Sequence, residues 1–262
     1  MRQALAAEWT KLRTVSSAAW LVAAAVGGTV LLGSAMTASV DTSQCPSPAS
    51  CQEDTVRLVL AGVWVGQVAV VVLAVLAVTN EYDTGMIQIT LAATPRRGTV
   101  LLAKAAVVTA TVLASGTAGV IGSLAAGRAI LPGNGFTEAN GYPPLSVTDE
   151  PTLRAAGGTV LYLGLVALLG LGLGAAVRDT AGALLGVLTL LYVAPVVAAL
   201  VGDPAWQARL QKVAPMTAGL AIQATRGLER LPIGPWAGLG VLAAWAGTAM
   251  LLGAVVLQVR DA

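Results

Sequence analysis

Long apolar stretches dominate the chain, and six of them have the length of a membrane-spanning helix. They cover residues 18–40, 58–79, 100–126, 155–177, 181–201 and 236–257. A helix needs about 20 apolar residues to cross the hydrocarbon core of a bilayer. Polar and apolar residues do not alternate in these stretches, as they would in barrel strands. We therefore expect an all-α membrane protein, with residues 1–262 forming a single domain of six transmembrane helices.

Two segments on one side of the predicted bundle are too short or too polar to span. Residues 1–14 place Leu5, Trp9 and Leu12 on one helical face, which predicts an amphipathic helix lying on the membrane surface. Residues 80–99 form a loop with an acidic start, an apolar middle and a basic end. We expect a short helix there that ends before Pro95. It would either dock another protein or lie buried in lipid.

A third segment, residues 202–234, precedes the last span. Trp206, Leu210 and Val213 form an apolar stripe that is interrupted at Pro215. Residues 218–228 are apolar enough to contact lipid but too few to cross it. This segment therefore predicts a pair of interfacial or re-entrant helices on the extracellular side.

Lysine and arginine near the early spans set the expected orientation. The N-terminus carries Arg2, Lys11 and Arg13, the first loop carries none, and the second loop carries Arg96 and Arg97. The positive-inside rule then places the N-terminus in the cytoplasm, and an even number of spans returns the C-terminus to the same side. The basic residues of the segment 202–234 run against this trend.

The composition excludes several classes of function. Only 11% of residues are charged, against about 25% in soluble domains, and there is no histidine. Nucleophile pairs that need histidine and histidine-ligated metal sites are thereby excluded. A net charge of +2 argues against a nucleic-acid partner. The chain also lacks the G-x-x-x-x-G-K-[ST] phosphate loop, so it does not bind ATP in that manner.

The predicted spans hold no Asp or Glu well inside the membrane, and we expect Lys104 to extend toward the cytoplasmic interface. Gln67, Thr109 and Ser115 are candidates for a substrate pathway. Their alternative role is hydrogen bonding that packs helices together. Small residues spaced four apart, from Ser115 to Gly127, predict close helix packing within or between subunits. Pro195 predicts a kink in the fifth span.

Two cysteines, Cys45 and Cys51, lie in the first loop, which is expected to be extracellular. An oxidising compartment would favour a disulfide between them. Two free thiols are the alternative. A metal site is not expected, because no histidine or further cysteine accompanies them.

Two sequences in the chain resemble those of ABC-2 type permeases, particularly the actinobacterial branch. They are EWTKLRTVSSAAW near the N-terminus and NEYDTGMIQITLAATPRRGTVLLAK after the second span. The family pattern of an acid, a Gly, an apolar turn, a Pro with basic neighbours and a Lys corresponds here to Glu81, Gly85, Ile87 to Leu91, Pro95, Arg96, Arg97 and Lys104. The resemblance extends over the whole chain through the order of its segments.

The resemblance implies the membrane subunit of an ATP-driven exporter. Two permeases, identical or related, would form the translocation path above two separate ATP-binding subunits, which would carry ATP and Mg²⁺. No cofactor is expected in this chain. The residues implied to couple to the ATPase are Glu81, Gly85, Met86, Ile87, Gln88, Leu91, Pro95, Arg96 and Arg97. Those implied to form a connecting helix beside it are Glu8, Trp9, Lys11 and Leu12.

Other functions stay open on the sequence alone. A non-transporting regulatory protein could use the same docking loop, whereas an ion-coupled carrier or channel is disfavoured by the uncharged spans. An enzyme is not expected. The uncharged spans suit a hydrophobic or amphipathic cargo such as a drug, an antibiotic or a lipid, and they do not select among these. The expected location is the plasma membrane, as a multi-pass protein.

Overall fold

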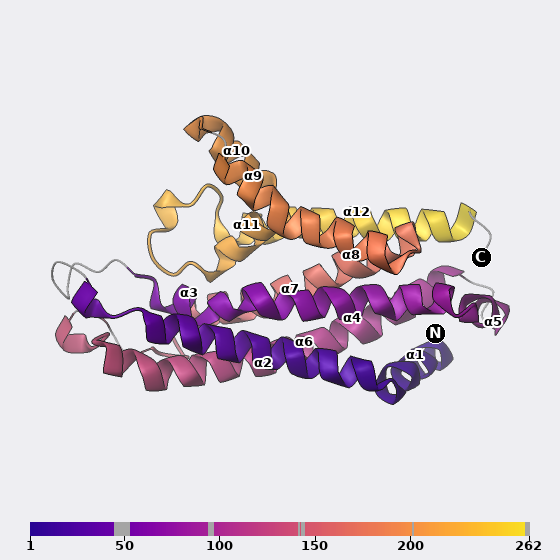
Figure 1. Cartoon of the computed structure of the whole chain (residues 1–262), viewed down its shortest axis with the longest axis horizontal. Coiled ribbons are helices and arrows are strands. Elements are labelled where there is room, and N and C mark those ends of the chain that lie inside the picture. The colour runs from indigo at the N-terminus through magenta and orange to yellow at the C-terminus, as the bar shows by residue number, and fades with distance from the viewer. Residues whose placement is uncertain (45–52, 94–96, 141, 143–144, 201, 260–262) are drawn as a thin grey trace.

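The computed structural model describes residues 1–44, 53–93, 97–140, 142, 145–200 and 202–259. Within these ranges every regular element is a helix (Figure 1). Six helical segments are long and apolar enough to cross a membrane: Ser16–Ser39, Thr55–Asp83, Arg97–Asn134, Glu150–Val177, Thr180–Leu200 and Pro235–Val259. The prediction of an all-α protein with six membrane-spanning helices is confirmed at this level, and the chain has the architecture of a multi-pass membrane protein.

These segments comprise most of the named elements. The first is α2 (Ser16–Ser39), and the second joins α3 (Thr55–Val59) to α4 (Val63–Asp83). The next are α6 (Arg97–Ile130) and α7 (Glu150–Val177). The fifth comprises α8 (Thr180–Leu188), a π-helical turn (Thr189–Val193) and α9 (Ala194–Leu200). The last is α12 (Pro235–Val259).

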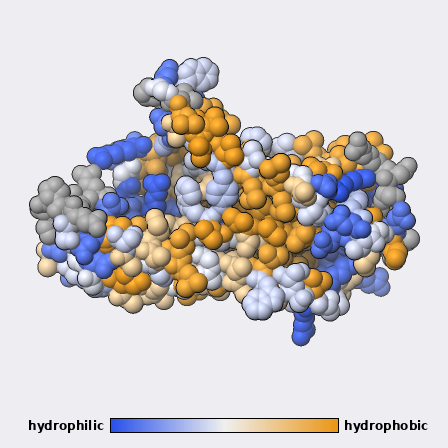
Figure 2. Space-filling model, in the orientation of Figure 1, coloured by the Kyte–Doolittle hydropathy of each residue, from blue (hydrophilic) through white to orange (hydrophobic). Residues whose placement is uncertain are grey.

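Short helices lie at both ends of this bundle. Helices α1 (Arg2–Thr14) and α5 (Met86–Ala93) lie at the same end of the bundle as the last turn of α12 (Figure 1). We call this end of the bundle the α1–α5 end. Helix α3 lies toward the opposite end, and α10 (Pro204–Val213) projects from the side of the bundle next to α9. Figure 2 shows an apolar surface around the middle of the molecule and hydrophilic residues gathered toward its two ends. This distribution is the one that a bilayer requires of a protein that crosses it.

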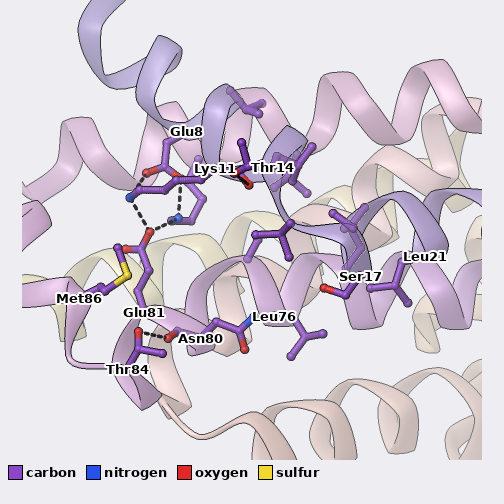
Figure 3. A pocket seen from close by; sticks show the side chains of 18 residues that line it. Glu8, Lys11, Thr14, Ser17, Leu21, Leu76, Asn80, Glu81, Thr84 and Met86 are labelled. Atoms are coloured by element: carbon purple, nitrogen blue, oxygen red, sulfur yellow. Dashed lines mark hydrogen bonds and ion pairs between the residues drawn. The ribbon is translucent and has the colours of Figure 1, made fainter.

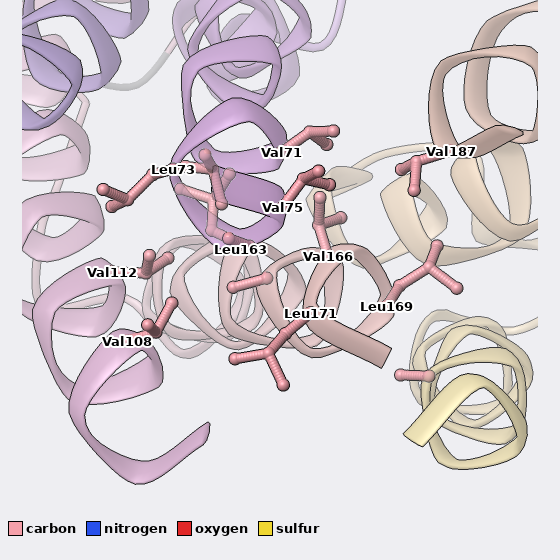
Figure 4. Close-up of a cluster of buried hydrophobic side chains, with 14 of the residues drawn as sticks. Val71, Leu73, Val75, Val108, Val112, Leu163, Val166, Leu169, Leu171 and Val187 are labelled. Atoms are coloured by element: carbon pink, nitrogen blue, oxygen red, sulfur yellow. The ribbon is translucent and has the colours of Figure 1, made fainter. Parts of the chain in front are cut away.

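Helices α4 and α7 form the centre of the bundle. In each of them 61% of the residues in the most apolar window are buried, against 22% in α2 and in the fifth span. Their apolar side chains meet those of α6 and α8 in one core, where Val75, Val112, Leu163 and Val187 all face inward (Figure 4). The peripheral helices expose large apolar residues such as Leu31, Leu185 and Leu251, as is appropriate for contact with lipid.

Small residues allow the helices to approach closely inside the chain. A methyl group added at Gly172 of α7 would lie 2.5 Å from the carbonyl carbon of Ala249 in α12. In α6, Gly119 faces Thr29 of α2, and the Ser123 hydroxyl donates to the carbonyl of Thr29 over 3.4 Å. The small-residue ridge of α6 therefore packs helices within one subunit, which settles one of the alternatives left by the sequence.

The fifth span is disrupted where the sequence predicts a kink. A π-helical turn, Thr189–Val193, ends two residues before Pro195, whose ring nitrogen has no hydrogen to donate. This turn projects Tyr192 toward α4, where the phenol donates a hydrogen bond to the carbonyl of Trp64. The irregular turn thereby brings a polar group into the bundle.

The segment before α12 returns into the bundle. Helix α11 (Pro215–Leu220) and the following turn bury Met216, Leu220 and Ile222 against α7 and α12. The prediction of a second short helix here is confirmed. The expectation that residues 218–228 contact lipid is wrong for 218–224, because small residues such as Gly158 and Gly238 let this segment pack inside the protein.

Candidate functional site at the α1–α5 end

Four charged side chains from three helices meet at the α1–α5 end, and we call them the polar cluster: Glu8, Lys11, Glu81 and Lys104. The Lys104 ammonium lies 2.5 Å from Glu8 Oε2 and 2.9 Å from Glu81 Oε1. The Lys11 ammonium lies 2.9 Å from Glu8 Oε1 and 2.7 Å from Glu81 Oε1. Lys11 also donates to the Thr90 hydroxyl of α5 over 3.4 Å. The polar cluster thus joins α1, α4 and α6, with a further contact to α5.

The cluster is largely removed from solvent. The side chains of Lys104, Glu8 and Glu81 are 6%, 7% and 9% exposed, whereas that of Lys11 is 34% exposed. Two positive and two negative charges cancel, which limits the cost of burying each of them. Removing a single partner would leave an uncompensated buried charge. The cluster therefore fixes the position of α1 against the bundle more strictly than apolar packing alone would.

The surroundings of Lys11 keep it charged. Burial by itself lowers the pKa of Lys11, but hydrogen bonds to Glu81 and Glu8 and their negative charges outweigh that effect. The net result is a pKa above the ordinary value of 10.5. Lys11 is therefore protonated throughout the physiological pH range.

Lys104 does not extend to the interface as the sequence predicts. Its ammonium turns inward, because two carboxylates on neighbouring helices lie within hydrogen-bonding distance. Glu8 and Glu81 are correspondingly directed into the protein, so they do not form a surface that a partner contacts directly. Any role of these two residues in coupling would be exerted through the position of α1 and α4.

The other residues of the predicted connecting helix divide between two faces. Leu12 packs against the hydrophobic core, and Lys11 belongs to the polar cluster. Trp9 is half exposed. Of the four residues named for this helix, only Trp9 presents a large side chain to the outside.

Helix α5 displays an apolar face at this end. Gly85 connects it to α4 with a φ of 69°, a left-handed conformation that strongly favours glycine. Ile89 is 70% exposed and Met86 and Gln88 are also exposed, whereas Ile87 is 7% exposed and faces the bundle. The side chain of Leu91 and residues Pro95 and Arg96 lie outside the described part of the chain. The predicted short helix is present, and it ends at Ala93, before Pro95.

Arg97 is engaged within the chain. Its guanidinium donates to the carbonyl of Leu257 over 2.8 Å, and Arg178 likewise donates to the carbonyl of Val256 over 2.9 Å. Both arginines thus bind the carboxyl end of α12, where carbonyl groups lack partners within the helix. The implied role of Arg97 in contacting an ATPase directly is not supported by this geometry. The sequence did not single out Arg178, which also lies 5.1 Å from the ring centre of Tyr82.

The three candidate pathway residues do not share one hydrogen-bond network among the described residues. Gln67 is fully buried and accepts from Tyr162 over 2.5 Å, while its amide donates to Tyr192 over 2.9 Å. Ser115 donates to the carbonyl of Val112 in its own helix. The buried Thr109 hydroxyl has no partner in the described part of the chain. For Gln67, packing between helices is the role that the structure displays.

Tyr162 and Tyr192 complete this network and were missed by the sequence analysis. A tyrosine in an apolar helix requires a partner for its hydroxyl when it is buried, and this requirement was the available signal. The pairing itself depends on how α4, α7 and the π-helical turn are arranged. No local pattern in the sequence reveals that arrangement.

The opposite end is held together by Asp54. Its carboxylate caps α3 at Arg57 and accepts from the backbone and hydroxyl of Thr225 over 2.5 and 2.7 Å. This contact ties the segment before α12 to the start of the second span. The predicted Cys45–Cys51 pair lies outside the described residues. Among the described residues, no group of three or more Cys, Asp or Glu side chains is placed to hold a metal ion.

Comparisons with known proteins do not identify the chain. No protein family model matches it, and no curated protein is detectably similar in sequence. The likeness to ABC-2 type permeases therefore rests on the two sequences quoted above and on the order of the segments. The structure establishes a multi-pass helical membrane protein with a charged cluster linking α1, α4 and α6.

Proposed function

We propose that this chain is the membrane subunit of an ATP-driven exporter of the ABC-2 type, located in the plasma membrane with both termini in the cytoplasm. Two permeases would pair to form the translocation path, and separate subunits would bind ATP and Mg²⁺. The observation that best supports this proposal is the placement of α5. This short helix exposes Met86, Gln88 and Ile89 at the end where α1 lies, as a docking helix would.

The connections of α5 suit the transmission of movement. Glycine at position 85 joins it to α4, and Thr90 contacts Lys11 of the polar cluster. A partner that displaces α5 would therefore act on the end of α4, and through Glu81 on α1 and α6. In this proposal the polar cluster couples the docking helix to three helices of the bundle, and no catalytic residue is needed in this chain.

The proposal is tested by purifying the complex through this chain from its native cells and determining its composition by native mass spectrometry. We expect two copies of this chain with two copies of a P-loop ATPase. Ile89→Asp should lose the ATPase while the chain itself stays folded, because the replaced side chain is exposed. Val147→Asp, which also replaces an exposed apolar residue but lies just before α7 begins at the opposite end, serves as the control and should keep the ATPase.

Three results would oppose the proposal. Purification without an ATPase, even after crosslinking, would remove the docking role of α5. Equal retention of the ATPase by Ile89→Asp and wild type would assign docking to another surface. An associated ATPase whose hydrolysis no amphipathic compound alters would favour a regulatory subunit that does not transport.

A further inference from the structure

A cavity of about 420 Å³ lies beside the polar cluster. It is lined by α1, the first turns of α2, the last turns of α4 and the first half of α6. Small-molecule sites have volumes of about 300–1,000 Å³ and combine apolar walls with a few polar groups. The apolar walls here come from Leu21 of α2, Leu73 and Leu76 of α4, and Val108 of α6. Figure 3 shows Glu8, Lys11 and Glu81 together at one side of the cavity, with Leu21 and Leu76 away from them.

One hydrogen-bonding position of the polar cluster is unused. Glu81 Oε1 accepts from both lysines, whereas Glu81 Oε2 is buried and has no partner among the described residues. A buried, charged acceptor without a donor destabilises the structure that contains it. The Met86 side chain lies beside the Glu81 carboxylate in Figure 3. Met86 lines the same cavity as Glu81, and its unbranched chain with three rotatable bonds can adjust to a ligand there.

The unused position determines the chemistry of a ligand. Both ammonium groups in the cluster already have carboxylate partners, so an anionic head group would find no free cation there. The two lysines balance the two carboxylates in the same way, so a cationic head group would add an uncompensated charge. A neutral head group that donates a hydrogen bond would satisfy Glu81 Oε2. Leu73 and Glu81 lie eight positions apart in α4, about 12 Å along the helix axis, which leaves room for an extended alkyl chain.

We propose that this cavity binds a single-chain amphiphile with a neutral head group that donates a hydrogen bond, such as an alcohol, with its hydroxyl on Glu81 Oε2 and its alkyl chain along Leu73, Leu76 and Leu21. Such a molecule would reach the cavity from the cytoplasmic leaflet, where α1 meets the membrane. It would lie between α1 and the bundle, in contact with both. This proposal concerns binding alone and holds whether or not the chain is part of an exporter.

The test uses photoreactive dodecanol, with a diazirine in the alkyl chain, added to the full chain in phosphatidylcholine nanodiscs. We expect saturable labelling on residues 73–77 of α4 and 18–21 of α2. Unlabelled dodecanol should compete. Dodecanoate and dodecylamine, which have the same chain but an anionic or a cationic head, should compete at least tenfold less well. Ser17→Trp should reduce labelling at least fivefold, because Ser17 lines the cavity.

Ser16→Trp provides the matched control and should label like wild type. Ser16 is the exposed neighbour of Ser17 in the first turn of α2 and does not line the cavity. Labelling that spreads over lipid-facing positions such as Leu31 without saturation would overturn the proposal. So would equal competition by dodecanoate or dodecylamine, or equal labelling of the Ser17→Trp and Ser16→Trp proteins.

Discussion

The ammonium of Lys104 lies 2.5 Å from a carboxylate oxygen of Glu8, although 96 positions separate the two residues in the chain. This contact joins the amphipathic helix α1 to the membrane-spanning helix α6. Both side chains are buried, and Glu81 and Lys11 complete the charge balance around them. The placement of α1 is therefore set by a specific set of ion pairs as well as by its apolar face.

Replacing Lys104 by methionine is expected to destabilise the chain by about 3–5 kcal/mol, since it leaves two buried carboxylates with only one lysine. Lys212→Met, at an exposed position on α10, is the matched control and should change stability by less than about 0.5 kcal/mol. Unfolding in detergent, followed by circular dichroism, measures both. Equal stability of the two variants would show that the cluster does not stabilise the fold.

The contribution of Lys11 should depend on pH. Because its pKa in the folded chain is raised above 10.5, the protonated form is favoured by folding. Its stabilising effect is fully present below the ordinary pKa and is lost as the pH rises through the raised value. The difference in stability between wild type and Lys11→Met should therefore be constant from pH 6 to about pH 9.5 and shrink above about pH 10.5. A difference that grows with alkaline pH would contradict this assignment.

The close approach of α7 and α12 should make Gly172 intolerant of a side chain. A methyl group there would lie 2.5 Å from backbone atoms of Ala249 and Met250, so Gly172→Ala is expected to cost about 1–3 kcal/mol. Gly157→Ala in the same helix has no atom within 4 Å and should be neutral or stabilising by up to about 1 kcal/mol. Thermal unfolding of the two variants compares them directly, and similar melting temperatures would rule out a tight α7–α12 contact.

The sequence predicts the helices far better than the partners of their polar groups. Runs of apolar residues determine the six spans, and Pro195 locates the irregular turn of the fifth, because these effects are local. The inward turn of Lys104 depends instead on Glu8 and Glu81, which approach it only after three helices pack. The snorkelling rule applies to a lysine next to lipid, and Lys104 faces two carboxylates. The partner of Arg97 was equally hidden from the sequence, because its acceptor, the carbonyl of Leu257, is distant in the chain.

The buried network of Gln67 and Tyr162 permits a test of how much a hydrogen bond contributes inside this bundle. Gln67→Leu removes the acceptor of the Tyr162 hydroxyl, and Tyr162→Phe removes the donor to Gln67. Each change leaves one buried polar group unsatisfied, whereas the double variant removes both groups of that bond. We expect a coupling energy of about 0.6–1.7 kcal/mol from the four-protein cycle, measured by unfolding in mixed micelles. Ser115→Ala should have little effect, because the partner of the Ser115 hydroxyl within the described part of the chain is the carbonyl of Val112 in its own helix. Strict additivity of the two changes would mean that this hydrogen bond adds nothing to stability, and Gln67 would then be better explained as part of a substrate path.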